Sequence, residues 1–525
     1  MFGVIRDAVE QTPYVALDDA FFLGRPAGPS ITKYLGIPYG GAPRFGAPVL
    51  VEPYAAGAVR DATAFGPACP QQAIKPPSIF LLQMWYDIVA RIARLIYAPP
   101  SGAEAEDCLF VNVVKPEKNS GEAFPVVVWI HGEDEPFRYD GTFIVQRSIE
   151  IERPILFVSI NYRICTAYGF LAGKEVKTAG VGNIGLRDQR LALRWGESSG
   201  AISVALQMAT NHGDSEGLFR GAIMQSGAPI PVGPIEHGQR YYDALVHDVG
   251  CHGRVDTLEC LRNVDFGTLR QAVDRSPSFF SYQSLNLAWV PRVDGVFLVD
   301  TPQKLVMSGS IANIPMISGS CYDEGTVFAL SSSNITTENQ TREYITTNYM
   351  PAATQTEIDE LLELYPQGEV PGWISLFVSP QFARIADLQG DLVFQAPRRF
   401  FLKYRSDLQP TWAFLSKRYK SLPLLGAFHG SDLSTVFPFH PSVRETDTGR
   451  IADAAIRDGF VDHVIHFIND LDPNAPGKGE AWPLYTSWKR RMLVFRDGPE
   501  TSVIRDDYRS DAMEVITNLS LKYPL

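Results

Sequence analysis

The sequence predicts an α/β fold with a large, mostly parallel central sheet flanked by helices. Two observations predict it: short apolar runs bounded by turn residues, typical of strands buried on both faces, and helical patterns between these runs. Of the 525 residues, 45% are hydrophobic and 11% aromatic, which is ample for a large core. Because no low-complexity linker, charge run or internal repeat divides the chain, we expect residues 1–525 to form a single domain.

The strand candidates share a run of consecutive apolar residues, and the helix candidates share a helical spacing of apolar residues. The strand candidates are, in chain order, Val126–Ile130, Ile155–Ile160, Gly221–Gln225, Ile314–Gly319 and Thr411–Leu415, and helical patterns include Gln239–Val249 and Thr356–Leu364. Alternating strands and helices indicate parallel βαβ units, whose active sites lie beyond the carboxyl ends of the strands. The segments that follow Ile130 and Gly319 are therefore the first candidate sites.

Residues 79–97 form the most apolar stretch of the chain. Gln83, Asp87, Arg91 and Arg94 recur at steps of four, four and three, which places them in one polar stripe of a helix. Two interpretations remain open. The segment is either a core helix or a surface flap whose apolar face contacts substrate or a lipid interface.

Charge and composition exclude several functions. The net charge of −12 opposes binding to phosphate backbones, so we expect no nucleic-acid partner. The first residues do not make a signal peptide, because Arg6, Asp7 and Glu10 interrupt any apolar run, and no stretch predicts a transmembrane segment. The six cysteines show no CxxC spacing, so no metal site is expected. Glycosylation triplets begin at Asn334, Asn339 and Asn518.

The pentapeptide Gly196–Gly200 (GESSG) fits the G-x-S-x-G pattern that exposes a nucleophilic serine on a strand-to-helix turn. Alone it is a weak signal, because roughly one chain in four of this length contains it by chance. A serine needs a histidine base oriented by a carboxylate. His429 lies in a loop of small residues, and Asp323 and Glu324, either of which could be the acid, follow the strand candidate that ends at Gly319. The chain order of Ser198, this acidic pair and His429 matches that of known serine hydrolases.

Further motifs make the resemblance specific, and they occur in one family's order through most of the chain. They are YLGIPYG (34–40), EDCLFVNV (106–113), VVVWIHG (126–132), SINYR (159–163), GFLAG (169–173), GNIGLRDQRLALRW (182–195), GESSGA (196–201), FRGAIMQSGAP (219–229), DEG (323–325) and GAFHGSDL (426–433). With these motifs the chain resembles the type-B carboxylesterase/lipase family, which includes cholinesterases and lid-bearing fungal lipases. The resemblance implies an α/β-hydrolase fold with a lid-like flap.

The resemblance also implies the chemistry. Ser198 is the nucleophile, His429 the general base and Glu324 its carboxylate partner, and backbone N–H groups of Gly132, Glu133 and Ser199 bind the oxyanion. The implied reaction is hydrolysis of small-molecule or lipid esters with hydrophobic acyl chains, through an acyl-enzyme. It requires no metal or organic cofactor. If residues 79–97 form the flap and not a core helix, they are where contact with a lipid interface is expected.

The family's disulfides and ion pairs have counterparts here as well. The resemblance implies disulfides Cys69–Cys108 and Cys251–Cys260, of which the first encloses the flap of residues 70–107. Cys165 and Cys321 are expected to be free thiols. The ion pairs Arg44–Glu106 and Arg163–Asp188 resemble buried structural pairs of the family. Family resemblance and the disulfides suggest a secreted protein, although no signal peptide is visible in this chain.

Two departures from the family pattern affect catalysis. The family has three glycines in its oxyanion loop, whereas this chain has Glu133 and Asp134 after Gly132, and carboxylates there oppose a developing negative charge. The family also has more than a dozen residues, including the nucleophile strand, between the ALRW helix and the elbow. Here Trp195 joins Gly196 directly, so either residues 190–195 form the strand or the elbow is not held.

Three functions remain in view from the sequence. The first is an active carboxylic ester hydrolase, as the family implies. The second is a catalytically impaired homologue, because of the two departures above. The third is an interaction module like the adhesion relatives of cholinesterases, which tend to lose the triad that this chain retains.

Overall fold

The computed structural model describes residues 12–73, 103–117, 123–132, 139–164, 166–192, 196–368, 378–437, 459–475, 481–498 and 500–525. The flap segment 79–97, Glu133, Asp134 and Cys165 lie outside these ranges, so the expectations that concern them are not described further. Among the described residues, no helix is long and apolar enough to cross a membrane.

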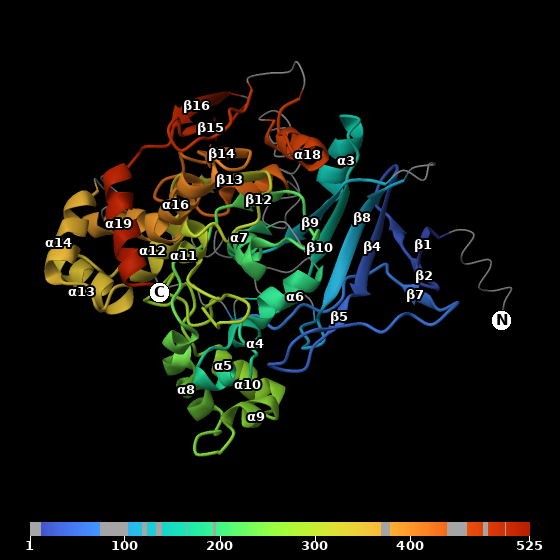
Figure 1. Ribbon diagram of the computed structural model, residues 1–525, viewed down its shortest axis with the longest axis horizontal. Coiled ribbons are helices and arrows are strands. Elements are labelled where there is room, and N and C mark those ends of the chain that lie inside the picture. The colour runs from blue at the N-terminus through green and yellow to red at the C-terminus, as the bar shows by residue number, and fades with distance from the viewer. Residues whose placement is uncertain are drawn as a thin grey trace.

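A twisted central sheet organises the molecule (Figure 1). Its strands, from one edge to the other, are β16 (Thr501–Arg505), β15 (Arg491–Phe495), β14 (Thr411–Ser416), β13 (Met316–Cys321), β12 (Ala222–Gln225), β11 (Gly196–Glu197), β9 (Val126–Ile130), β10 (Leu156–Ile160), β8 (Phe110–Pro116), β4 (Ile31–Pro38) and β3 (Arg25–Pro26). The block from β15 to β10 is parallel, and the pairs at both edges are antiparallel. The predicted mostly parallel sheet is confirmed, and all five strand candidates belong to it.

The two faces of the sheet follow the alternation of side chains along each strand. In β14, Trp412 and Phe414 pack with helices α3 (Thr142–Glu150) and α18 (Phe460–Asp470). The intervening Ala413 and Leu415 pack on the opposite face with α7 (Ser199–Ala209), α11 (Pro302–Met307) and α16 (Ala396–Arg405). In Figure 1, α3 and α18 accordingly lie together on one side of the strands. A helix layer on each face shields the apolar strands from water, as the sequence pattern predicted.

The remaining elements lie around this core. They are β1 (Tyr14–Leu17), β2 (Ala20–Leu23) and β7 (Val59–Asp61) in one small sheet, β5 (Gly40–Gly41) and β6 (Val49–Leu50) in another, and the helices α4 (Ala167–Phe170), α5 (Lys174–Thr178), α6 (Ile184–Ala192), α8 (Gln239–Asp248), α9 (Thr257–Arg262), α10 (Phe266–Val273), α12 (Thr326–Ala329), α13 (Glu338–Asn348), α14 (Gln355–Leu364), α15 (Pro380–Gly390) and α19 (Ser510–Lys522). Helices α8 and α14 match the two helical patterns of the sequence. Thr354 begins α14 with a reciprocal capping box to Glu357, which fixes that helix start.

The strand before the elbow differs from the expectation. Arg190–Ala192 is the last turn of α6, so the hypothesis that residues 190–195 form the nucleophile strand is wrong for its first half. Gly196 and Glu197 instead form β11, a strand of two residues. It pairs in parallel with β9 on one side and with β12 on the other. The elbow is therefore held in the sheet, but by a very short strand.

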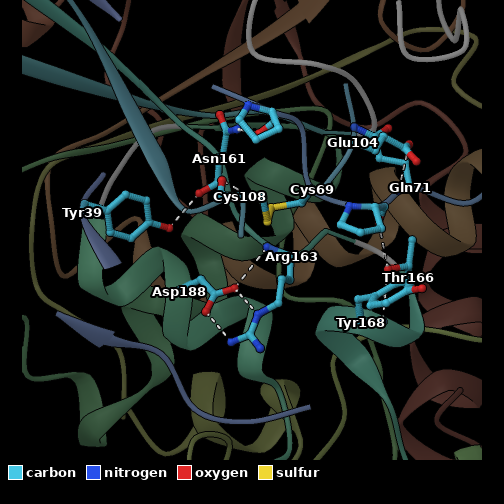
Figure 2. Close-up of a disulfide and its surroundings, with 12 residues drawn as sticks. Tyr39, Cys69, Gln71, Glu104, Cys108, Asn161, Arg163, Thr166, Tyr168 and Asp188 are labelled. Carbon is cyan, nitrogen blue, oxygen red and sulfur yellow. Dashed lines mark hydrogen bonds and ion pairs between the residues drawn. A yellow bond between two sulfur atoms is a disulfide. The ribbon is translucent and has the colours of Figure 1, made fainter. Parts of the chain in front are cut away.

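Two disulfides cross-link segments of the described chain. Cys69 is bonded to Cys108, and Cys251 is bonded to Cys260. Figure 2 shows the first disulfide beside the buried ion pair of Arg163 and Asp188.

In the buried pair, the Arg163 guanidinium donates to both oxygens of Asp188, at 2.8 and 2.7 Å, and this links the end of β10 to α6. Arg44 makes a similar two-point contact with Glu106, with both N···O distances at 2.6 Å. Bidentate pairs of this kind fix orientation as well as distance. The Arg163–Asp188 pair lies beside the Cys69–Cys108 disulfide in space, and Glu106 stands two residues before Cys108 in the chain.

Candidate active site

The sequence around Ser198 forms a sharp turn between β11 and α7. Ser198 has φ 56° and ψ −121°, a conformation that an L-residue adopts only when its surroundings enforce it. Its N–H donates to the carbonyl of Gln225 at 2.9 Å. A side chain on Gly200 would lie 1.9 Å from the carbonyl oxygen of Ile130, so this position must be glycine. The turn lifts the Ser198 hydroxyl out of the sheet at the amino end of α7.

Glu324 lies at the carboxyl end of β13 and is 1% exposed. One of its oxygens, Oε1, accepts the Cys321 backbone N–H at 2.6 Å. The neighbouring Asp323 has a different environment, because its carboxylate pairs with Lys420 and accepts the Ala427 N–H. The structure therefore directs Glu324 inward and uses Asp323 to attach the following loop.

His429 lies in the loop after β14 and connects the other two residues. Its Nδ1 lies 2.6 Å from Oε2 of Glu324, and its Nε2 lies 2.7 Å from Oγ of Ser198. The imidazole also packs against the rings of Phe394 and Phe328, with centroid distances of 4.6 and 5.2 Å. Three residues separated by more than one hundred positions in the chain thus form one hydrogen-bonded row.

The loops that carry the acid and the histidine are attached to each other. The Asp323 N–H donates to the Ala427 carbonyl at 2.9 Å, and Asp323 and Phe428 form a parallel bridge. With the Ala427 N–H bonded to the Asp323 carboxylate at 2.8 Å, the two loops cannot separate without breaking several hydrogen bonds.

A second buried carboxylate lies behind the row. Asp432 is 2% exposed and accepts a hydrogen bond from Gln225 Nε2 at 3.3 Å. Burial, followed by the charge of Glu324, raises the pKa of Asp432. The buried free thiol of Cys321 lies 3.5 Å from Ser431 Oγ, and burial raises its pKa well above the ordinary value. This thiol is therefore protonated at neutral pH.

Two of the three expected oxyanion donors, Gly132 and Ser199, belong to the described residues. Ser199 is the first residue of α7, where backbone N–H groups have no carbonyl partner within the helix and the helix dipole favours negative charge. Gly132 is buried directly after β9, and its carbonyl lies 2.9 Å from Nδ1 of His131. Burial lowers the pKa of His131 to about 4, so this neighbouring ring is neutral at neutral pH.

Sequence reasoning did not identify Phe328, Phe394, Gln395 or Asp432, all of which lie within or beside this site. Asp432 stands three residues after His429 and was visible inside the GAFHGSDL motif. The aromatic residues and the glutamine reach the site only through the packing of α12 and α15, for which the sequence carries no local signal. The three asparagines of the glycosylation triplets are all exposed.

Comparisons with known proteins find similarity along most of the chain. The carboxylesterase family matches residues 21–195 and 196–515. A protein named Lipase 4 from Diutina rugosa is 38% identical, with 86% of each chain covered, and the secreted triacylglycerol lipase LIP1 from Gibberella zeae is 36% identical, with 78% of this chain and 74% of the relative covered. The crystal structure of EstA from Aspergillus niger superposes with a TM-score of 0.82 at 25% identity, over 98% of this chain and all of that one.

Proposed function

Because this chain belongs to the carboxylesterase family and is a carboxylic ester hydrolase with the α/β-hydrolase fold, we propose that Ser198, His429 and Glu324 are its catalytic triad. The observation that carries the proposal is the continuous row of hydrogen bonds from Glu324 through His429 to Ser198, with distances of 2.6 and 2.7 Å. A nucleophile, a base and a group that orients the base are the three parts that ester hydrolysis by serine requires.

The first half of the reaction forms an acyl-enzyme. Glu324 accepts a hydrogen bond from the Nδ1–H of His429, which keeps Nε2 unprotonated and able to take the proton of the Ser198 hydroxyl. The hydroxyl oxygen then attacks the ester carbonyl, and His429 returns the proton to the leaving alcohol. In the second half, His429 activates a water molecule that hydrolyses the acyl-enzyme and restores Ser198.

Contacts at both oxygens fix the orientation of the Glu324 carboxylate toward His429. Oε1 accepts the Cys321 N–H and Oε2 faces His429, so the side chain cannot rotate away from the imidazole. Both side chains are also shielded from bulk solvent, because Glu324 and His429 are 1% and 2% exposed. In a low-dielectric site, the negative carboxylate stabilises the imidazolium that forms during the transfer more strongly than it would in water.

The oxyanion of the tetrahedral intermediate would lie near the amino end of α7. There the Ser199 N–H and the helix dipole favour negative charge, and the Gly132 N–H would contribute from the loop after β9. For substrate, we propose hydrophobic acyl esters, because relatives that are 38% and 36% identical to this chain are named lipases. Relatives named as secreted lipases and two disulfides support secretion of this chain.

A pair of matched substitutions tests the triad. Turnover of a chromogenic short-chain ester should fall by about 10⁴-fold in Ser198→Ala, whereas Ser203→Ala, at another buried serine of α7, should retain it. Glu324→Gln should lower the catalytic rate far more than Asp323→Asn, because only Glu324 contacts His429. Equal rates for the wild type and Ser198→Ala would reject the proposed mechanism.

A catalytically impaired hydrolase is the second candidate, and one finding favours it. The family match is divided between residues 195 and 196, directly before the elbow, where the resemblance implies that this sequence lacks residues that relatives have. Glu133 and Asp134 also replace oxyanion glycines. If these carboxylates limit the rate, the double variant Glu133→Gly, Asp134→Gly should hydrolyse the same ester about 10²-fold faster. An unchanged rate would show that the two carboxylates do not impair the enzyme.

A further inference from the structure

The helix pair α15 and α16 is joined by a π-helical turn, Asp391–Gln395, that lies against the proposed triad. The Ala396 N–H donates to the Asp391 carbonyl, five residues earlier, which defines the wider turn. Pro397 follows at the start of α16, and a proline there has no N–H to give and would clash with the carbonyl four residues before it in a regular helix. Widened turns of this kind are rare and occur frequently at functional sites.

Helix α15 approaches the backbone of the acid very closely. A side chain on Gly325 would lie 1.9 Å from the Ala386 carbonyl oxygen, and one on Gly390 would lie 3.3 Å from Cβ of Glu324. Only glycines at these two positions allow the end of α15 to reach the Glu324 main chain. The π-helical turn begins at Asp391, directly after Gly390, and its residues therefore follow the point where α15 contacts the Glu324 main chain.

Two consecutive residues of the turn then reach the site. The Phe394 ring packs on the His429 imidazole with a centroid distance of 4.6 Å. The Gln395 amide donates through Nε2 to the carbonyl of Cys321 at 2.7 Å. Cys321 in turn gives its N–H to Glu324 at 2.6 Å. The turn therefore contacts the base directly and the acid through one residue.

The amide of Gln395 is itself fixed from the other side. Its Oε1 accepts the Tyr508 hydroxyl at 2.7 Å and Arg398 Nη2 at 3.4 Å. With two donors at the oxygen, the amide cannot flip, and the nitrogen must face Cys321. Gln395 is 1% exposed, so no solvent molecule replaces these partners when one is removed.

We infer that Gln395 is a positioning residue, which holds the Cys321 main chain so that its N–H orients Glu324 toward His429. This inference rests on the proposed triad. It assigns part of the positioning of Glu324 to a residue outside the loops that carry the triad. Losing the Gln395 amide leaves the Cys321 carbonyl buried and unpaired, and this peptide segment can relieve that cost only by moving away from Glu324.

The substitution Gln395→Leu tests the inference, because leucine has a similar volume and removes the three hydrogen bonds of the amide. We expect kcat for a soluble chromogenic ester to fall about tenfold with KM unchanged, and labelling of Ser198 by a fluorophosphonate to slow by the same factor. The matched control is Gln381→Leu. Gln381 is an equally buried glutamine of α15 that bonds to Thr341 and makes no described contact with the triad.

Two additional measurements keep the test decisive. Proton NMR of protein with ¹⁵N-labelled histidine follows the Nδ1–H of His429, identified by its loss in His429→Gln, and needs no turnover. Its far-downfield signal should weaken or shift in Gln395→Leu and stay in place in Gln381→Leu. Should Gln395→Leu fail to fold, Tyr508→Phe removes one donor to the same amide and should lower kcat by about twofold to threefold.

The outcomes separate the two proposals. A variant Gln395→Leu that melts at a lower temperature but keeps kcat and the His429 signal would overturn the positioning role, while the triad would stand. A wild-type protein whose turnover is unaffected by Ser198→Ala would reject the proposed function, and the NMR signal would still decide whether Gln395 orients the pair of Glu324 and His429.

Discussion

At the scale of single residues, the turn at Ser198 requires glycine at position 200, which has no Cβ. Gly200 follows Ser199 in the first turn of α7, and a Cβ there would meet the Ile130 carbonyl at 1.9 Å and the His131 carbonyl at 3.0 Å. Both atoms belong to the main chain of the neighbouring strand end, so neither can move cheaply. We expect Gly200→Ala to lower the free energy of unfolding by about 3 kcal/mol, measured by urea denaturation.

The matched control for this prediction is Gly41→Ala, since a Cβ at Gly41 has no atom within 4 Å. That variant should unfold at nearly the same urea concentration as the wild type. Because Gly→Ala lowers the backbone entropy of the unfolded chain, that entropy change opposes a loss of stability, and similar losses in the two variants would contradict the clash as the cause at Gly200.

Also at the residue scale, one buried carboxylate predicts how stability changes with pH. Burial alone would raise the pKa of Asp506, but the charges of Arg398 and Arg399 outweigh it and lower this pKa to about 2. Because the pKa is lower in the folded protein than in the unfolded chain, the ionised pair stabilises the fold above about pH 4. This contribution, on the order of 2 kcal/mol, should disappear as the pH falls from 4 to 2.

The measurement is the free energy of unfolding at several pH values between 5 and 2. In Asp506→Asn the fall over this interval should be smaller by the contribution of the pair, even though the variant is less stable throughout. Asp511→Asn, which removes an exposed carboxylate, should follow the wild-type pH dependence. Identical slopes in all three proteins would contradict the shift at Asp506.

At the scale of elements, the two disulfides should differ in what they contribute. Cys69 and Cys108 are 39 residues apart, whereas Cys251 and Cys260 are 9 apart. In the chain-entropy model, the longer loop is stabilised by roughly 4 kcal/mol and the shorter one by about 2.5 kcal/mol. Replacing each pair with serines should therefore lower the melting temperature more for Cys69–Cys108, as calorimetry can measure. The reverse order would show that strain or denatured-state structure outweighs loop length.

The element scale also shows what the sequence could predict. Five of the parallel strands were recognisable because burial on both faces demands unbroken apolar runs, such as Val126–Ile130, whereas β11 and β15 were not among the candidates. The antiparallel strands β4 and β8 mix polar and apolar residues, so their pattern alone did not identify them. The π-helical turn was invisible, because a proline marks a helix start as well as a widened turn, and only tertiary packing separates these possibilities.

The residues of the site likewise fall into those that the sequence could predict and those that it could not. Ser198, Glu324 and His429 could be proposed because each stands in a motif with its own backbone requirement, a turn or a strand end. Phe394 and Gln395 could not, because their roles come from the approach of α15 to Glu324 across a long sequence separation. The sequence did signal the shortened connection before Gly196, although its structural solution, a strand of only two residues, was not anticipated.

At the scale of the whole molecule, β11 is the narrowest connection in the described part of the sheet. Among the described residues it shares one pair with β9 and two with β12, whereas β13 and β14 share six. Within that part of the chain, β11 joins the strands from β3 to β9 to those from β12 to β16, and α7 packs against both groups. Local opening requires the fewest broken contacts at such a junction, so this part of the sheet should have the lowest free energy of opening.

Native-state hydrogen exchange tests this view through two comparable amides. The Ser198 N–H bonds to Gln225 O at 2.9 Å, and the Ser226 N–H bonds to Gly319 O at 2.8 Å, each in the turn after a parallel strand and each at a residue with positive φ. The two hydrogen bonds have similar lengths, so a difference in the exchange rates of the two amides would reflect a difference in the stability of the strands that precede them. We expect Ser198 to exchange much faster than Ser226, because β11 opens without the rest of the sheet. Equal protection would mean that α7 alone holds the two parts together, and that the shortened strand does not weaken the support of the nucleophile.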